Sequence, residues 1–209
     1  MSLLVYMIVL THGQQPANGA KSQKVMFPHS CEKTQQIDGT DRLSDTKAIS
    51  SRERAVLIEA ISIQLRPGKK IGTPRSEKKL LTAVMETRVT MVDLNGDGIP
   101  EVIVQASDRE SCSPTGNCPV WVFTRSGNEY KQILVKNSVQ TFGICTSRTD
   151  GFFDLVLGQH GSASEQALYI YRFANERYNR RTCYMANFTR LVGDEVQELE
   201  EPDITLCKP

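Results

Sequence analysis

The sequence lacks the charge excess and the aromatic basic patches of nucleic-acid-binding proteins. Its formal net charge is +1 at pH 7, which gives no general attraction to nucleic acid or to anionic membranes. Residues 52–79 are locally basic but contain no aromatic residue, whereas surfaces that bind single strands combine positive charge with aromatic stacking. We expect this stretch and the acidic stretch 194–203 to be solvated surfaces of opposite sign. The sequence therefore indicates no nucleic-acid partner.

No stretch of the sequence is expected to span a membrane. The apolar run at 3–10 is too short to cross a bilayer. Small residues follow this run, as in a secretory signal peptide, although no basic residue precedes it. We expect residues 1–20 to be a signal peptide, cleaved after Gly13 or Ala20, and the protein to be secreted or periplasmic.

The cysteines lack the CxxC spacing of zinc and redox sites. The chain has six cysteines, and an even set in a chain of this size favours disulfides and an oxidising compartment. Cys112 and Cys118 bracket a loop that contains proline and glycine, so we predict a local disulfide there. A second disulfide is predicted between Cys183 and Cys207. The pairing of the others stays open, and free thiols in a cytosolic protein are the alternative.

A polar segment and a helix are predicted before the first strand. Residues 21–50 have few apolar positions, and we expect a linker or a loosely attached arm. Ser50 and Glu53 have the spacing of a capping box, and a Pro-Gly pair at 67–68 ends the helix. We expect the helix to cover a sheet and the basic segment 68–79 to be a loop. The apolar stripe of the helix is Leu57, Ile58, Ile61 and Leu65.

From residue 87 onward the sequence consists of short runs rich in β-branched and aromatic residues. Alternation within the runs, and Gly, Asn and Ser clusters between them, predict strands joined by turns. We therefore expect one α+β domain over residues 51–209. It should be mainly an antiparallel β meander with the helix as an N-terminal cover.

An internal repeat divides this β-rich region. Residues 87–104 align without a gap on residues 140–157, at an offset of 53 residues. Beyond them the offset shortens to 48, and the extra residues fall in the loop between Cys112 and Cys118. The repeat predicts two four-stranded units, over residues 87–135 and 140–183, each with an acidic turn between its first two strands.

The acidic turn of the first unit, DLNGDGIPE, has the composition of a cation site. Ca²⁺ binds six to eight oxygen atoms from carboxylates, amides and backbone carbonyls. Asp93, Asn95 and Asp97 supply side-chain oxygens at alternate positions, the Ile99 carbonyl can point inward, and Glu101 can close the shell. We predict a Ca²⁺ site; a tight turn that merely joins two strands is the alternative.

The sequence around this turn resembles the FG-GAP/VCBS type of calcium-binding repeat. In that family D-x-[DN]-x-D-G-x-x-[DE] joins two strands, whereas an EF-hand is flanked by helices and carries a Glu where this chain has Val104. The resemblance covers residues 87–105 and, more weakly, 140–158. It implies Ca²⁺ binding in an extracytoplasmic, non-enzymatic module. Two units are too few to close a complete propeller.

The second acidic turn has lost half of the ligand pattern. Thr146 replaces the first Asp and Arg148 replaces Asn95, while Asp150 and Asp154 remain. We expect this turn to be free of metal, with the Arg148 guanidinium supplying positive charge to the two carboxylates.

The sequence analysis thus favours an exported binding or interaction module with a structural Ca²⁺ site. Its partner would be another protein or a cell-envelope component. The alternative is a small secreted inhibitor or immunity-type protein that blocks a cell-wall enzyme through the loop 112–118 or 158–165. A hydrolase that uses His160 with Ser162 or Glu165 is a third hypothesis, without a G-x-S-x-G motif to support it.

Overall fold

The computed structural model describes residues 26–207 except 33, 38, 40, 66–76 and 128. The predicted signal peptide, the Pro-Gly pair at 67–68 and most of the basic loop lie outside the described residues. Within the described part the chain is predominantly antiparallel β with two helices, as the α+β prediction requires. Neither of these helices is long and apolar enough to cross a membrane.

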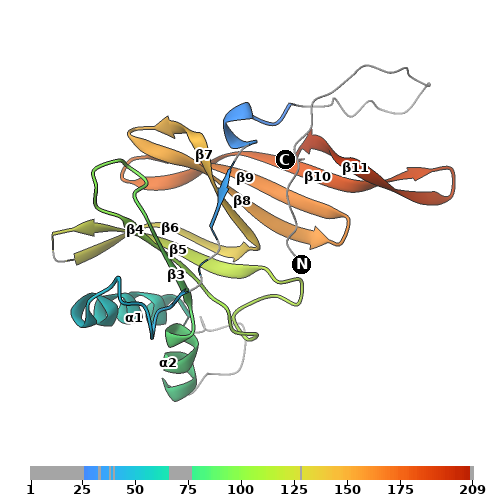
Figure 1. Ribbon diagram of the computed structural model, residues 1–209. Coiled ribbons are helices and arrows are strands. Elements are labelled where there is room, and N and C mark those ends of the chain that lie inside the picture. Colours follow the sequence, from blue (N-terminus) through green and yellow to red (C-terminus); the bar gives the residue numbers. More distant parts are fainter. Residues whose placement is uncertain are drawn as a thin grey trace.

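The strands form two antiparallel sheets, which we call the first and the second sheet (Figure 1). The first sheet has the order β2-β3-β4-β5-β6, with β2 at Asp41–Arg42, β3 at Arg88–Val92, β4 at Glu101–Gln105, β5 at Cys118–Ser126 and β6 at Glu129–Val139. The second has the order β1-β7-β8-β9-β10-β11, with β1 at Gln35–Gln36, β7 at Thr141–Thr149, β8 at Phe152–Ser162, β9 at Glu165–Ala174, β10 at Arg177–Val192 and β11 at Glu195–Leu206.

Each sheet contains a run of four consecutive strands, β3–β6 (the first meander) and β7–β10 (the second meander). Their registers agree. Val89 pairs with Val104 in the first meander, and Phe142 pairs with Leu157 in the second, at the offset of 53 residues that the sequence alignment gives. The third strands agree at the offset of 48: Trp121 pairs with Val104, and Tyr169 with Leu157.

Both meanders have a register shift at the same place in their last strand. The pairing of β6 with β5 shifts by one residue at Ile133, and the pairing of β10 with β9 shifts by one residue at Arg181. Such a shift is a β-bulge, in which one extra residue enters one strand. We call two residues that occupy the same place in the two meanders corresponding residues; Ile133 and Arg181 are an example.

The elements lie in layers, with a hydrophobic core between each neighbouring pair (Figure 1). Helices α1 (Ser51–Leu65) and α2 (Glu77–Met85) cover one face of the first sheet. The other face of the first sheet packs on the second sheet. The N-terminal segment and its 3₁₀ helix η1 (His29–Cys31) cover the remaining face of the second sheet. Each face of the two meanders therefore contributes residues to a core shared with another element.

The predicted capping box begins α1. The Glu53 amide donates to Ser50 Oγ at 3.3 Å, and the Ser50 amide donates to Glu53 Oε2 at 2.9 Å. This reciprocal pair satisfies two helix-terminal donors. Leu57 and Ile61 of the predicted stripe are fully buried, so the helix covers a sheet as expected.

The second helix differs from the sequence prediction, which ended the basic loop at residue 79. Helix α2 begins at Glu77, and it buries Leu80, Ala83 and Val84. A helix of this length is marginal by itself. Packing against α1 and the first sheet stabilises it. Leu80, Ala83 and Val84 have the spacing of one helix face, a local signal that the sequence prediction missed.

The described part of the predicted linker or loose arm, residues 26–50, is instead anchored. Phe27, Ile37, Leu43 and Ile49 are buried, and residues of this segment pair with β3 and β7. These apolar residues are widely spaced in the sequence, so each enters a core separately and no periodic pattern results. Burial of single side chains holds this arm to both sheets.

Candidate metal site

The acidic loop 93–101 joins β3 to β4, as the sequence predicted. Gly96 and Gly98 have φ angles of +81° and +82°. This left-handed region is open to glycine without the cost that a Cβ atom adds. The two glycines bend the loop so that its amide groups turn toward its own side chains.

Asp93 accepts hydrogen bonds from the loop backbone through both carboxylate oxygens. The Gly96 amide lies 2.6 Å from Oδ1, and the Gly98 amide lies 2.9 Å from Oδ2. Desolvation raises the pKa of Asp93, but these amide donors outweigh it and hold the pKa below its usual value. Asp93 is therefore ionised and fixed in position.

Asn95 and Asp97 complete the ordered part of the loop. The Asp97 amide donates to Asn95 Oδ1 at 2.9 Å, Asn95 Nδ2 donates to Asp97 Oδ2 at 2.8 Å, and the Ile99 amide donates to Asp97 Oδ1 at 2.7 Å. An ionised carboxylate oxygen has more than one acceptor site. Such an oxygen can therefore accept one of these hydrogen bonds and also bind a cation. The donors fit Ca²⁺, which binds carboxylate, amide and carbonyl oxygens.

Glu101 points into the protein beneath the loop. Its side chain is 1% exposed. Oε2 accepts from the Leu94 amide at 2.7 Å, and Oε1 accepts from the Thr124 hydroxyl at 3.0 Å. Burial raises the pKa of Glu101, and the nearby charge of Asp97 adds to this effect. No cationic side chain pairs with Glu101 among the residues that the structure describes.

Over the same residues, no three His, Cys, Asp or Glu side chains gather as a metal-ligand cluster. The loop side chains face their own backbone, and Glu101 faces the sheet. Binding of an ion by this set would therefore require side-chain rotation toward a common point.

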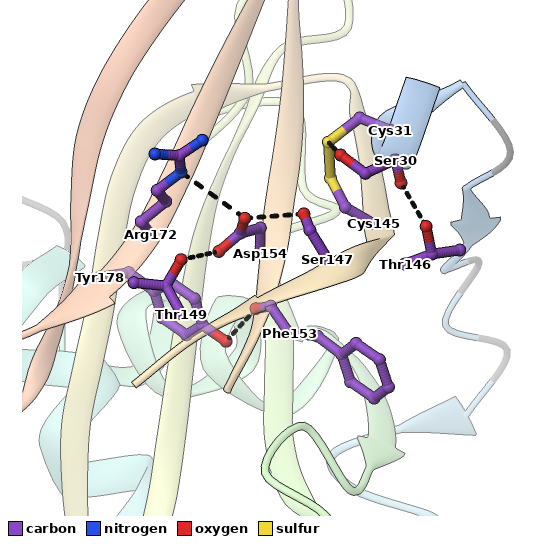
Figure 2. A network of polar contacts seen from close by, with 10 residues as sticks. All are labelled: Ser30, Cys31, Cys145, Thr146, Ser147, Thr149, Phe153, Asp154, Arg172 and Tyr178. Carbon is purple, nitrogen blue, oxygen red and sulfur yellow. Dashed lines mark hydrogen bonds and ion pairs between the residues drawn. A yellow bond between two sulfur atoms is a disulfide. The ribbon is translucent and has the colours of Figure 1, made fainter. Parts of the chain in front are cut away.

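Asp154 is the corresponding residue of Glu101 and is buried in the same way, at 2% exposure. It accepts hydrogen bonds of 2.7 Å from the hydroxyls of Ser147 and Thr149 (Figure 2). Unlike Glu101, it has a cationic neighbour, because Arg172 Nε lies 3.6 Å from Oδ2. The second turn thus neutralises its buried carboxylate with a side chain of β9.

Arg148 does not have the role that the sequence suggested. Its Nη1 donates to the carbonyl oxygens of Asn95 at 2.9 Å and Gly151 at 2.8 Å, and the guanidinium carbon lies 3.7 Å from the centroid of the Phe153 ring. The expectation that it pairs with Asp150 and Asp154 is therefore wrong. Arg172 was missed because it lies one strand further along the chain, where no turn motif marks it.

The cysteines form three disulfides. Cys112–Cys118 and Cys183–Cys207 are the two that the sequence predicted. The third, Cys31–Cys145, ties the N-terminal arm to β7, and Figure 2 shows it beside the Thr146 hydroxyl, which donates to the Ser30 carbonyl oxygen at 3.1 Å. The third bridge fixes the arm close to the second acidic turn.

The two candidate inhibitor loops lie together. Asn117, in the loop 112–118, donates through Nδ2 to the His160 carbonyl oxygen at 2.8 Å and accepts from the His160 amide at 2.9 Å. His160 contributes its backbone to this contact. The neighbouring Ser162 hydroxyl lies 3.1 Å from the Ser164 hydroxyl. These contacts brace a surface, and they do not align a nucleophile with a base.

Comparison of the chain with protein-family models, with curated proteins and with solved structures finds no match.

Proposed function

We propose that this protein is an exported, calcium-binding interaction module with a structural Ca²⁺ site in the loop 93–101. The observation that carries the proposal is the difference between Glu101 and Asp154. Both carboxylates are buried at corresponding positions, but among the described residues only Asp154 has a cationic neighbour. A buried carboxylate without a counter-charge is costly.

The residue at the position of the counter-charge can be compared between the two meanders. Arg172 supplies it in the second meander, and Thr124 is the corresponding residue in the first. The Thr124 hydroxyl donates a hydrogen bond to Glu101 but carries no charge. The first turn instead has Asp93, Asn95 and Asp97 directly above the buried carboxylate. A divalent ion held by these oxygens supplies the positive charge that Arg172 supplies to Asp154.

We also propose that the two meanders are copies of one four-stranded unit, related by duplication. The shared register and the shared bulge position support this. The directions in which the sheet faces point also support duplication. Trp121 and Phe123 face the helices, whereas the corresponding Tyr169 and Tyr171 face the first sheet. The units are therefore stacked front to back, as adjacent blades of a propeller are.

The helices and the N-terminal arm explain how two stacked units are stable without a ring. Repeat arrays expose an apolar face at each end unless a cap covers it. Helices α1 and α2 cover one end of the stack, and the arm covers the other. Both ends of the two-unit stack are therefore covered by described residues.

The calcium proposal is tested by calorimetric titration of the chelator-treated chain. One Ca²⁺ should bind per chain, with a rise in melting temperature through preferential binding to the folded state. Asp97→Ala should abolish both effects. Asp150→Ala, the same change at the corresponding residue, should leave both intact. A stoichiometry of two, or equal loss in both variants, would contradict the proposal.

Export rests on the three disulfides, which form and persist in oxidising compartments. Cell fractionation with thiol labelling of the full chain tests it. The protein should appear outside the cytoplasm with all cysteines protected from alkylation. Recovery in the cytoplasm with reduced cysteines would refute export.

The inhibitor hypothesis is the second candidate, and the loop 112–118 favours it. The loop is exposed at residues 113–116, closed by a disulfide, and held by hydrogen bonds from Gly116 to Ser113 and from Asn117 to His160. A rigid exposed loop loses little entropy on binding. Assays against a panel of cell-wall hydrolases test it: inhibition by the native chain should disappear in Thr115→Trp, which enlarges the loop tip, and inhibition by both proteins or neither would refute it.

A further inference from the structure

A cluster of hydrogen-bond donors lies between the facing surfaces of the two sheets. It consists of Lys136 on β6, Tyr169 and Tyr171 on β9, and Arg180 on β10. Lys136 pairs with Val120, whose side chain belongs to the core between the sheets, and paired residues share a face. Arg180 pairs with Tyr171, which belongs to the same core. Three strands from two sheets therefore direct these side chains into one space.

The two positive charges share one aromatic ring. Lys136 Nζ lies 4.4 Å from the centroid of the Tyr169 ring, and Arg180 Cζ lies 5.6 Å from it. Burial lowers the pKa of Lys136, and the charge of Arg180 lowers it further. The two like charges repel one another. The ring attracts both, but it supplies no negative charge.

The two cations of the cluster have no carboxylate partner among the described residues. Within the residues that the structure describes, neither Lys136 nor Arg180 pairs with a carboxylate, and the hydroxyls of Tyr169 and Tyr171 make no hydrogen bond. Tyr171 is 7% exposed as a whole residue, but its hydroxyl keeps contact with solvent and is free to donate to a ligand. A bound anion would supply the negative charge that the two cations lack.

The first meander shows that a meander of this kind packs without the two tyrosine hydroxyls and the Arg180 guanidinium. The corresponding residues of Tyr169, Tyr171 and Arg180 are Trp121, Phe123 and Gln132. Trp121 and Phe123 are fully buried under the helices. The hydroxyls and the guanidinium thus occur at these positions in the second meander and not in the first.

We propose that Lys136, Tyr169, Tyr171 and Arg180 form a binding site for a phosphate or sulfate group. The two cations match the charge of such a dianion, and charge-assisted hydrogen bonds are the stronger ones. Arg180 is exposed, so the group can enter from solvent beside the edge strand β6. The site is distinct from the acidic loop and does not depend on calcium.

The test is calorimetric titration of the full, calcium-saturated chain with inorganic phosphate and, separately, with polyphosphate, at constant ionic strength. Arg180→Gln and Tyr171→Phe introduce the corresponding residues of the first meander. We expect the affinity to fall at least tenfold in Arg180→Gln and several-fold in Tyr171→Phe. Arg181→Gln removes the same charge from the neighbouring exposed position and should bind within twofold of the native chain.

Saturable binding of free phosphate that Arg180→Gln weakens supports a site for the free ion. Binding of polyphosphate alone, with the same sensitivity, supports a site for a phosphate group on a larger molecule. Absence of binding to both probes overturns the proposal, as does an equal loss in Arg181→Gln. If Arg180→Gln does not fold, Lys136→Met carries the same expectation and the same test.

Discussion

Arg148, on β7 of the second sheet, donates a hydrogen bond of 2.9 Å to the carbonyl oxygen of Asn95, in the acidic loop of the first sheet. The Phe153 amide makes a second link, to the Leu94 carbonyl oxygen at 2.9 Å. The two acidic turns therefore touch, and the Arg148 guanidinium of the second turn lies against the backbone of the first. Substitution of Arg148, which makes one of these links, should therefore alter the properties of both turns.

Arg148→Gln should have opposite effects on stability and on calcium affinity. The free energy of unfolding in chelator should fall by about 1 kcal/mol, because an exposed guanidinium loses its stacking on Phe153 and its links to two carbonyls. Calcium affinity should rise a few-fold, because one repelling charge is removed. Denaturation and calorimetry measure the two effects. Arg190→Gln, on the exposed end of β10, is the control and should change neither.

Glu101→Gln should change how stability depends on pH. The pKa of Glu101 is raised in the folded state, so its protonated form stabilises the fold below the ordinary pKa of about 4.5, and this stability is lost as the pH rises through the folded pKa. In chelator, raising the pH from the ordinary pKa through the folded pKa should lower the free energy of unfolding of the native chain. The free energy of unfolding of Glu101→Gln should not fall in this way, because its side chain does not titrate. Calcium should remove the loss, because it pairs with the ionised form. Denaturation curves from pH 4 to 8 that run parallel for both proteins would count against this account.

Thr124→Arg should reproduce in the first meander the counter-charge of the second. A guanidinium at this position should lie beside Glu101 as Arg172 lies beside Asp154. We expect a higher melting temperature in chelator and at least tenfold weaker calcium binding. Thr124→Gln, long but neutral, is the control and should not raise the melting temperature. Unchanged calcium affinity in Thr124→Arg would show that the ion does not neutralise the charge of Glu101.

The three disulfides should differ in their contribution to stability. Cys31–Cys145 closes a separation of 114 residues, Cys183–Cys207 one of 24, and Cys112–Cys118 one of 6. In the chain-entropy model, the corresponding losses of unfolding free energy are about 5, about 3.5 and about 2 kcal/mol. Paired Cys→Ser variants and denaturant titration test this order. An inverted order would show that native contacts, and not chain closure, dominate.

The turn at 93–101 and the capping box could be predicted because each depends on residues close together in the sequence. Gly96 and Gly98 permit the bends, and Asp93 lies within reach of their amides. The strand pattern was equally local, since alternation marks a strand whatever covers it. The two predicted disulfides also followed from spacing and loop composition.

Contacts between distant segments could not be predicted in the same way. Arg148 donates to the Asn95 carbonyl oxygen and does not pair with Asp150, and Arg172 lies beside the Asp154 carboxylate. The stacking of the two sheets decides which side chains are neighbours. The burial of Phe27 and Leu43 depends on surfaces that exist only after both sheets have formed.

The sequence by itself determined the turns, the strands, the first helix and the acidic character of the loop 93–101. These follow from backbone preferences and from hydrogen bonds between near neighbours. The tertiary structure alone decided that, within the described residues, a guanidinium lies beside Asp154 and none beside Glu101, and that Lys136 and Arg180 share the ring of Tyr169. The physical reason is that charge neutralisation acts through space, and the distances that govern it are set by the stacking of the two sheets.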